Sequence, residues 1–363
     1  MTDTAVPSLN LTDDVAELTA ALMAIESVSG NEKTIADAVE NALRAYPHLE
    51  VSRDGDSVVA RTNLGRTERV ILAGHLDTVP LPTVPGSRGT VPPSWDGDVL
   101  YGRGATDMKG GVAVQLALAA TLTEPTRDVT YIFYDHEEVD ASLSGLGRLA
   151  ESHAEWLRAD FAILLEPTNG TVEGGCNGTM RFHATTTGRA AHSARAWMGE
   201  NAIHAAAEIL VRLRDHSPAT VSVEGLDYRE SLNAVKVWGG TAGNVIPDAA
   251  TVEINYRFAP DKSVAEAEAY VRNLLAGFDV VRTDAAAGAR PGLTLPAAAS
   301  FVAAVGAEPK PKYGWTDVAR FSALGVPAVN FGPGDALLAH TDNEHVDAAA
   351  IRTCLASLRT WLS

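Results

Sequence analysis

Short apolar segments alternate with longer segments of helical periodicity through the first half of the chain. Strands are predicted at residues 69–74 (RVILAG), 129–134 (VTYIFY) and 161–165 (FAILL). Uninterrupted apolar runs of this length are typical of strands that are buried on both faces. Their alternation with helical segments predicts an α/β domain with a mostly parallel sheet and helices on both of its faces.

Two helices are predicted within the first 50 residues. Apolar residues recur there at helical spacing in two series, Val15, Leu18, Leu22 and Ile25, and then Ile35, Val39 and Leu43. Ser29 and Glu32 stand three residues apart just before the second series, which is the spacing of a capping box. The two side chains are therefore expected to close the first turn of the second helix.

The pattern changes after residues 174–179, where a second domain is predicted. Its elements are a strand at 180–187, a helix at 200–215, strands at 231–238 and 251–258, a helix at 264–276 and a strand at 278–283. This order is that of an α+β, ferredoxin-like split βαβ module. Residues 177–290 are therefore expected to form a domain inserted into the first, which comprises residues 1–176 and 291–363.

Composition excludes several classes of protein. The chain has 363 residues, 46% of them hydrophobic, but no apolar run of the roughly 18 residues that a membrane span needs. Its N-terminus is acidic, unlike a signal peptide, and its two cysteines are too few for a disulfide framework. A formal net charge of −17 argues against nucleic acid as a partner. We therefore expect a cytoplasmic protein that binds neither a membrane nor nucleic acid.

Polar residues of the metal-binding types follow each predicted strand. His75 and Asp77 follow the first strand, Glu137 and Glu138 the second, and Glu166 the third. In open α/β sheets the ligand site lies beyond the carboxyl ends of the strands. Each residue alone also has an ordinary explanation, such as a core histidine or a solvated acidic loop. Glu166 is the least ambiguous, because an acid directly after FAILL needs a partner to offset its burial.

Two further loops supply Asp107, in the glycine-rich GRGATDMKGG, and His340, in GPGDALLAH. The ordinary explanations are a local turn for Asp107 and a surface histidine for His340. Together with His75, Glu138 and Glu166 they nevertheless make a mixed histidine and carboxylate set, which suits Zn, Co or Mn better than Ca or Mg. Two such ions can hold a hydroxide and polarise a carbonyl, which leaves Glu137 as the base.

At these residues the chain resembles the dinuclear zinc family that includes acetylornithine deacetylase, succinyl-diaminopimelate desuccinylase, aminoacylase and carboxypeptidase-type enzymes. The resemblance covers nearly the whole chain and rests on GHLDTVP, GRGATDMKGG, DHEEVD, LLEPTN and ALLAHTDNE. It implies two zinc ions per subunit, for which cobalt can substitute, with Asp107 bridging them. His75 and Glu166 would hold one ion, and Glu138 and His340 the other. Glu137 would be the general acid and base, and Asp77 would orient His75.

The resemblance also implies roles for the inserted domain, which is the dimerisation module in this family. His192 in GRAAHSARAW would stabilise the oxyanion in the partner subunit's site, and Asn244 in GNVIPD would assist it. Arg257 in NYRF would bind a substrate carboxylate, and Gly314 and Thr316 in GWTD would also contact substrate. The ordinary explanations are a helix cap for His192 and an ion pair within the sheet for Arg257.

The prediction is therefore a homodimeric, metal-dependent amide hydrolase that acts on a small anionic acyl amino acid. Within the family, GRAAHSARAWMG, NVIPD and YGWTDVARFSALG are most similar to the desuccinylases of succinyl-diaminopimelate. A deacylase or dipeptidase acting on N-acetylornithine or another acyl amino acid stays an alternative, because the motifs constrain the metal centre more than the pocket. A non-catalytic binding protein on the same fold is an alternative of another class, and it would require a broken centre.

Overall fold

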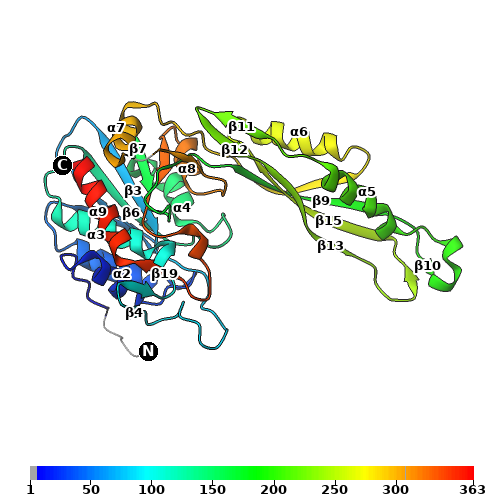
Figure 1. Ribbon diagram of the computed structural model, residues 1–363, viewed down its shortest axis with the longest axis horizontal. Coiled ribbons are helices and arrows are strands. Elements are labelled where there is room, and N and C mark those ends of the chain that lie inside the picture. Colours follow the sequence, from blue (N-terminus) through cyan, green and yellow to red (C-terminus); the bar gives the residue numbers. More distant parts are fainter. Residues whose placement is uncertain (1–5, 307) are drawn as a thin grey trace. The chain divides into compact units, whose positions relative to one another are not determined.

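A computed structural model describes residues 6–306 and 308–363, which divide into two compact units (Figure 1). The larger unit contains the chain up to Gly174 and the segments Gly292–Lys310 and Arg320–Ser363. The smaller unit contains Gly175–Pro291 and Pro311–Ala319. The domain boundaries given above, at residues 177 and 290, stay predictions.

An eight-stranded sheet forms the centre of the larger unit, in the order β1-β2-β6-β3-β7-β18-β8-β17. The four central strands β6, β3, β7 and β18 are parallel, as predicted, whereas β1, β2 and β8 add antiparallel pairs toward the edges. β3 and β6 are buried along almost their whole length, which explains their unbroken apolar sequences. The bounds are β1 Glu50–Asp54, β2 Ser57–Arg61, β6 Asp128–Tyr134, β3 Arg69–His75, β7 Phe161–Leu164, β18 Ala328–Asn330, β8 Glu173–Gly174 and β17 Lys310–Pro311.

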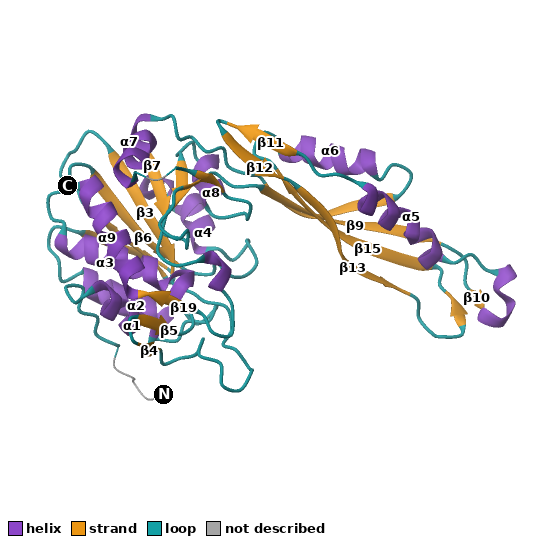
Figure 2. Cartoon of the chain, viewed as in Figure 1, coloured by secondary structure: helices purple, strands orange, loops and turns teal. Residues whose placement is uncertain are grey.

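Helices cover both faces of this sheet, as predicted (Figure 2). α3 Gly110–Thr121 is apolar on all sides, because it lies between the sheet and the helices α1 Val15–Met23 and α9 Ala348–Leu362. The other helices wholly or mainly in this unit are α2 Lys33–Leu43, α4 Gly145–Ser152, α7 Pro296–Val305 and α8 Val318–Ala323, with the short turns η1 Ala105–Lys109, η2 Ala154–Leu157 and η4 Ala336–Leu338. A small sheet of β4 Ser94–Asp96, β5 Val99–Tyr101 and β19 His345–Asp347 completes the unit.

The predicted capping box at the start of α2 is wrong. Glu32 is the N-cap residue of α2, and no side chain caps that helix end. The Ser29 hydroxyl instead donates to the Asp77 carboxylate at 2.7 Å. The Glu32 carboxylate accepts the backbone N–H groups of Gly30 and His136 at 2.9 and 3.2 Å. Both residues thus bind the edge of the sheet where the candidate ligands lie, and that long-range contact outweighs the local pattern.

The smaller unit contains the predicted β-α-β-β-α-β order. Its four-stranded antiparallel sheet runs β13-β15-β9-β16, with α5 and α6 packed on it. The bounds are β9 Gly178–Thr187, α5 Ala202–Asp215, β13 Ser231–Gly239, β15 Ala249–Phe258, α6 Val264–Leu274 and β16 Asp279–Ala286. Here a capping box does form at α6, where Ser263 and Glu266 bond to each other's backbone N–H groups.

Two additions to the smaller unit were not predicted. A hairpin of β11 Thr220–Val223 and β12 Leu226–Arg229 stands between α5 and β13. A two-stranded pair of β10 Ala191–His192 and β14 Val245–Ile246 adjoins the turn η3 Ser193–Met198. No helix in the described part of the chain is both long enough and apolar enough to cross a bilayer.

Candidate metal centre

The carboxyl ends of the parallel strands bring three candidate ligands and the candidate base Glu137 to one edge of the large sheet. His75 is the last residue of β3, Glu137 and Glu138 lie just beyond β6, and Glu166 lies just beyond β7. His75 and Glu166 are buried, with 1% and 7% of their surfaces exposed. An acid and an imidazole held this deeply need partners that offset the loss of water.

Two glycines allow the backbone around Glu166 to pack closely. A Cβ atom at Gly111, near the start of α3, would collide with the carbonyl oxygen of Leu165. A Cβ atom at Gly332, just after β18, would collide with the carbonyl oxygens of Leu165 and Glu166. These two positions therefore need glycine, because neighbouring segments approach the β7 end without room for a side chain.

Asp107 and His340 come from two loops outside the sheet. Asp107 lies in the turn η1, and His340 follows η4 with a left-handed φ of 62°. The Asp107 carboxylate lies between two imidazoles, with Oδ1 3.0 Å from Nε2 of His75 and Oδ2 3.2 Å from Nε2 of His340. Nε2 of His340 also lies 2.9 Å from Oε1 of Glu138. The five predicted ligands therefore converge on one place.

Among the described residues the candidate ligands form three overlapping groups, two of which share Asp107. His75, Asp107 and Glu166 make one group, and Asp107, Glu138 and His340 make another, with ligand atoms within 4.8 Å of one another in each. Glu137 belongs to a third group, with His75 and Glu138, which does not contain Asp107. Two triads that share one carboxylate suit a pair of neighbouring cations.

Acids and imidazoles hold one another in charged form at this centre. Burial would lower the pKa of His75, but the Asp107 and Asp77 carboxylates raise it well above its usual value. Contacts with Asp107 and Glu138 raise the pKa of His340 to about 10. Burial would raise the pKa of Asp107, but His340 and His75 hold it well below its usual range. The carboxylates thus attract positive charge strongly, and cations could replace the two imidazole protons.

Asp77 is fully buried behind His75 and connects it to the Glu137–Glu138 turn. The Asp77 backbone carbonyl lies 3.0 Å from Nδ1 of His75, and its carboxylate Oδ1 lies 3.5 Å from the same nitrogen. The carboxylate accepts the backbone N–H groups of Glu137 and Glu138, each at 3.0 Å. Burial would raise the pKa of Asp77, but hydrogen bonds from His75, Ser29 and Glu137 lower it to about 2.

The comparisons with known proteins agree with this geometry. The sequence pattern that defines peptidase family M20/M25/M40 matches residues 71–363. The chain belongs to this peptidase family. A Mycobacterium tuberculosis protein named DapE is 54% identical over 357 residues, covering 98% of this chain and 99% of that protein. The succinyl-diaminopimelate desuccinylase of Corynebacterium glutamicum is 44% identical over 368 residues, covering 98% of each chain.

A solved structure supports the M20 fold. The Bacillus subtilis protein YXEP, described as a dinuclear metal-binding peptidase of the M20 family, matches with a TM-score of 0.72. The match covers 97% of both chains at 17% sequence identity, so it concerns the fold alone. The predicted α/β fold with a second α+β unit is therefore confirmed for this M20 chain.

The sequence did not indicate two residues that support the M20 centre. One is Ser29, through its bond to Asp77. The other is Glu344, which is fully buried and accepts the backbone N–H groups of Thr106 and Asp107 at 3.0 and 3.1 Å. Its other oxygen accepts from Arg103 at 2.7 Å. Glu344 thus joins the loop of Asp107 to the segment that follows His340. The only sequence feature that pointed to this residue is the presence of an acid in the TDNEH segment, close to His340.

The predicted oxyanion residue His192 lies in the smaller unit at the exposed end of β10. Its Nδ1 accepts the backbone N–H of Ala194 at 3.1 Å, so the suggested capping role is also present. Because a neutral imidazole has one donor and one acceptor, this bond leaves the proton on Nε2. The carbonyl of Asn244 accepts the N–H of Ser193 at 2.9 Å, which holds these two predicted residues close together.

The other predicted substrate residues also lie in the smaller unit. Arg257 on β15 is partly buried, and its Nε donates to Asn255 at 3.2 Å. Among the described residues no acid forms an ion pair with it, so the alternative of an acidic partner on its own sheet does not hold. Gly314 is exposed, whereas Thr316 is buried and its hydroxyl has no hydrogen-bond partner in the described chain. Their roles toward substrate stay predictions.

Proposed function

We propose that this protein is a metal-dependent amide hydrolase that cleaves N-succinyl-LL-2,6-diaminopimelate to succinate and LL-2,6-diaminopimelate. The observation that carries the hydrolytic part is the position of Asp107 in two triads of ligand atoms at once. The substrate follows from the name of the Corynebacterium glutamicum relative, which matches over nearly the full length of both chains. An intact set of ligands argues against a non-catalytic binding protein.

The residues at the centre fit two divalent cations, and we propose zinc for both. His75 and Glu166 would hold one ion, Glu138 and His340 the other, and Asp107 would bridge them. Three carboxylates and two imidazole nitrogens form a donor set that suits zinc and cobalt. Two cations bound there would polarise the amide carbonyl and lower the pKa of a water molecule.

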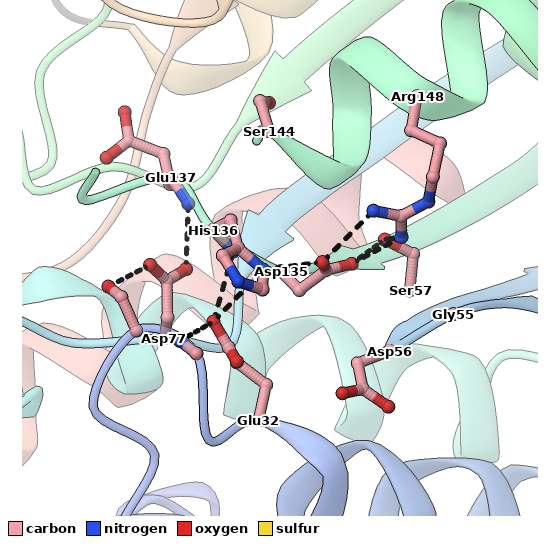
Figure 3. A network of polar contacts seen from close by, with 12 residues as sticks. Glu32, Gly55, Asp56, Ser57, Asp77, Asp135, His136, Glu137, Ser144 and Arg148 are labelled. Atoms are coloured by element: carbon pink, nitrogen blue, oxygen red, sulfur yellow. Dashed lines mark hydrogen bonds and ion pairs between the residues drawn. The ribbon is translucent and has the colours of Figure 1, made fainter. Parts of the chain in front are cut away.

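Glu137 would move the proton in this reaction. It is grouped with His75 and Glu138 but not with Asp107, the proposed bridging ligand, so we assign its carboxylate to the attacking water. Glu137 would accept one proton from that water and return it to the amide nitrogen as the carbon–nitrogen bond breaks. Figure 3 shows the Glu137 carboxylate pointing away from Asp77, whose carboxylate accepts the backbone N–H of Glu137. A backbone fixed in this way orients the Glu137 side chain, as the role of a general base requires.

Arg257 would bind a carboxylate of the substrate. Burial and the neighbouring Arg181 lower the pKa of Arg257, whereas Asp284 raises it, so a second guanidinium and one carboxylate stand close by. The two cations outnumber this acid, in a chain whose net charge is −17. A guanidinium can form two parallel hydrogen bonds with a carboxylate, which makes it selective for that group.

The proposed enzyme would work as a homodimer that pairs through the edge strand β13. Val235, Val237 and Trp238 on β13 are 51%, 59% and 45% exposed. Ile203, Leu210 and Val211 on α5, which contacts β13, are also exposed. The opposite edge strand β16 carries the charged residues Asp279, Arg282 and Asp284, which protect an edge from pairing. His192 would then serve the partner's site, where its Nε2–H would stabilise the oxyanion.

A substrate panel tests this function. The purified, zinc-loaded protein is assayed on N-succinyl-diaminopimelate, N-acetyl-diaminopimelate and N-acetylornithine. A site that pairs a succinyl carboxylate rejects analogues without it by about 10⁴-fold, since its donors are left unpaired. Comparable kcat/KM values for the succinyl and acetyl compounds would favour a general aminoacylase. No turnover of any of them by the metal-loaded protein would favour the binding protein.

A further inference from the structure

The turn between β6 and the catalytic carboxylates has a strained backbone. His136 has a left-handed φ of 57°, a conformation that residues other than glycine adopt at a cost in free energy. It directly precedes Glu137, the proposed base, and Glu138, a proposed ligand. Such strain persists only where the surroundings hold it in place. The contacts around His136 therefore show what fixes the two glutamates.

Three successive backbone N–H groups of this turn donate to buried carboxylates. Those of Glu137 and Glu138 donate to Asp77, each at 3.0 Å, and that of His136 donates to Glu32 at 3.2 Å. Figure 3 shows Glu32 and Asp77 on the same side of the turn. Asp77 already has a role through His75, whereas Glu32 contacts no candidate ligand directly in the bonds described above.

The Glu32 carboxylate is buried at a cost in free energy. It is fully buried, and one of its carboxylate oxygens has no hydrogen-bond partner in the described chain. The other oxygen accepts from Gly30 and His136, and it lies 3.4 Å from Nδ1 of His136. Burying a carboxylate with so few donors costs free energy, and an apolar residue would avoid that cost. Stability of the fold therefore does not explain why an acid stands here.

The same ring nitrogen of His136 lies closer still to a second carboxylate. Its Nδ1 lies 2.7 Å from Oδ2 of Asp135, and Arg148 on α4 donates to both oxygens of that carboxylate, at 2.7 and 3.2 Å. Ser57 on β2 donates to Asp135 too. Arg148 is bound in turn by Asp54 at 2.7 Å. A network that reaches the β1–β2 hairpin thus fixes the imidazole ring of His136. The backbone N–H of His136 is held instead by Glu32.

We propose that Glu32 is a positioning residue, which sets the direction of the Glu137–Glu138 turn through the His136 backbone. This proposal rests on the proposed function, because it assumes that Glu137 and Glu138 act at the metal centre. Without the Glu32 carboxylate, His136 can relax toward an ordinary φ and turn both glutamates away. A displacement of about 1 Å is enough to lower the rate about 10²-fold.

Two substitutions at Glu32 separate positioning from stability. Glu32→Ala removes the acceptor of the two backbone N–H groups, whereas Glu32→Gln retains an acceptor oxygen of the same reach. With saturating zinc and the best substrate of the panel, Glu32→Ala should lower kcat about 10²-fold with little change in KM. Glu32→Gln should recover most of the lost kcat. Equal losses in the two variants, or a loss confined to KM, would overturn the proposal.

Asp128 supplies a matched control. It is the first residue of β6, the strand whose other end leads into the His136 turn. It is buried and accepts the backbone N–H groups of Leu64 and Arg66 at 2.8 and 2.9 Å, as Glu32 accepts two such groups. Asp128→Ala should lower the Tm and leave kcat near the wild-type value. If it lowered kcat as much as Glu32→Ala, the effect at Glu32 would be loss of stability and not positioning.

A metal titration tests the same idea without turnover. Metal-free wild type and variants are titrated with Co²⁺, and the visible absorbance of the bound ion is followed. Because Glu138 moves with the turn, Glu32→Ala should weaken one of two binding steps by about 10–100-fold, and Glu32→Gln and Asp128→Ala should not. Unaltered titration of Glu32→Ala would overturn the proposal. A wild type that binds two ions but hydrolyses no substrate of the panel would instead refute the proposed function alone.

Discussion

Oδ2 of Asp77 accepts the backbone N–H of Glu138 at 3.0 Å. The acid that contacts His75 of one triad therefore also fixes the backbone of a ligand in the other triad. A single substitution at Asp77 should consequently affect both triads. This coupling distinguishes Asp77 from an acid that serves only as the hydrogen-bond partner of one histidine.

The first prediction concerns this coupling. Asp77→Asn places an amide group where two backbone N–H groups and the His75 ring need an acceptor, so both metal ions should bind about 10–100-fold more weakly. Isothermal titration of the metal-free protein with Zn²⁺ measures this. Ser29→Ala, which removes one bond to Asp77 and leaves the carboxylate in place, should have a smaller effect. Weakening of only one ion would show that the coupling is absent.

The second prediction separates the base from its neighbouring ligand. Glu137→Gln should keep its full metal content while kcat falls by about 10²–10⁴, the usual contribution of general acid–base catalysis. Glu138→Gln should lose metal from one site. Elemental analysis and steady-state kinetics on both variants make the test. Loss of zinc in Glu137→Gln with an unchanged rate would mean that the two roles are reversed.

The third prediction concerns metal and stability. A ligand that binds only the folded state at 100 times its Kd stabilises that state by about 2.7 kcal/mol, so added zinc should raise the Tm of the metal-free protein. The rise should shrink in His340→Ala, which removes one ligand. His183→Ala, in the smaller unit and outside every triad, should keep the full rise. Equal rises in all three proteins would refute His340 as a ligand.

The fourth prediction concerns the β13 edge. Val237→Asp places a charge on a strand that we expect to pair with its copy, and it should convert the dimer to a monomer in light scattering after size exclusion. Val281 on β16 is exposed to a similar degree, 53% against 59% for Val237. Val281→Asp should therefore leave the dimer intact. Dissociation by the β16 variant alone would assign the interface to the other edge.

The fifth prediction is that each active site is shared between subunits. His192→Ala and Glu137→Gln should both be nearly inactive alone. In a mixed dimer, the site with an intact Glu137 receives an intact His192 from its partner, so about a quarter of the wild-type activity should return on random co-assembly. Co-expression with two different tags isolates the mixed dimers. Mixed dimers without recovered activity would mean that His192 does not act across the interface.

The positions of the ligands were predictable because strand ends are encoded locally. RVILAG, VTYIFY and FAILL are continuous apolar runs, and parallel strands deliver whatever follows them to one edge. His75, Glu138 and Glu166 could therefore be grouped before the fold was known, and the structure brings them together with Asp107 and His340. The ferredoxin-like order of the smaller unit was predictable for the same reason, since each element carries its own periodicity.

The residues behind the ligands were not predictable in this way. Ser29 and Glu32 have the spacing of a capping box, but the fold places the Asp77 and His136 partners beside them. Glu344 bonds to an N–H group 237 residues earlier in the chain, a contact that no local pattern encodes. The antiparallel pairs at the sheet edges and the β11–β12 hairpin likewise depend on which neighbour each segment meets.

The Glu344 contacts also have a consequence for the order in which this centre is built during synthesis. Glu344 fastens the Asp107 loop, yet it emerges from the ribosome only after the whole smaller unit has been made. Until then Asp107 has neither that support nor its contact with His340. A metal ion held by Asp107, Glu138 and His340, as we propose, would therefore bind only late in synthesis and would join two loops of the first half of the chain to one near its end.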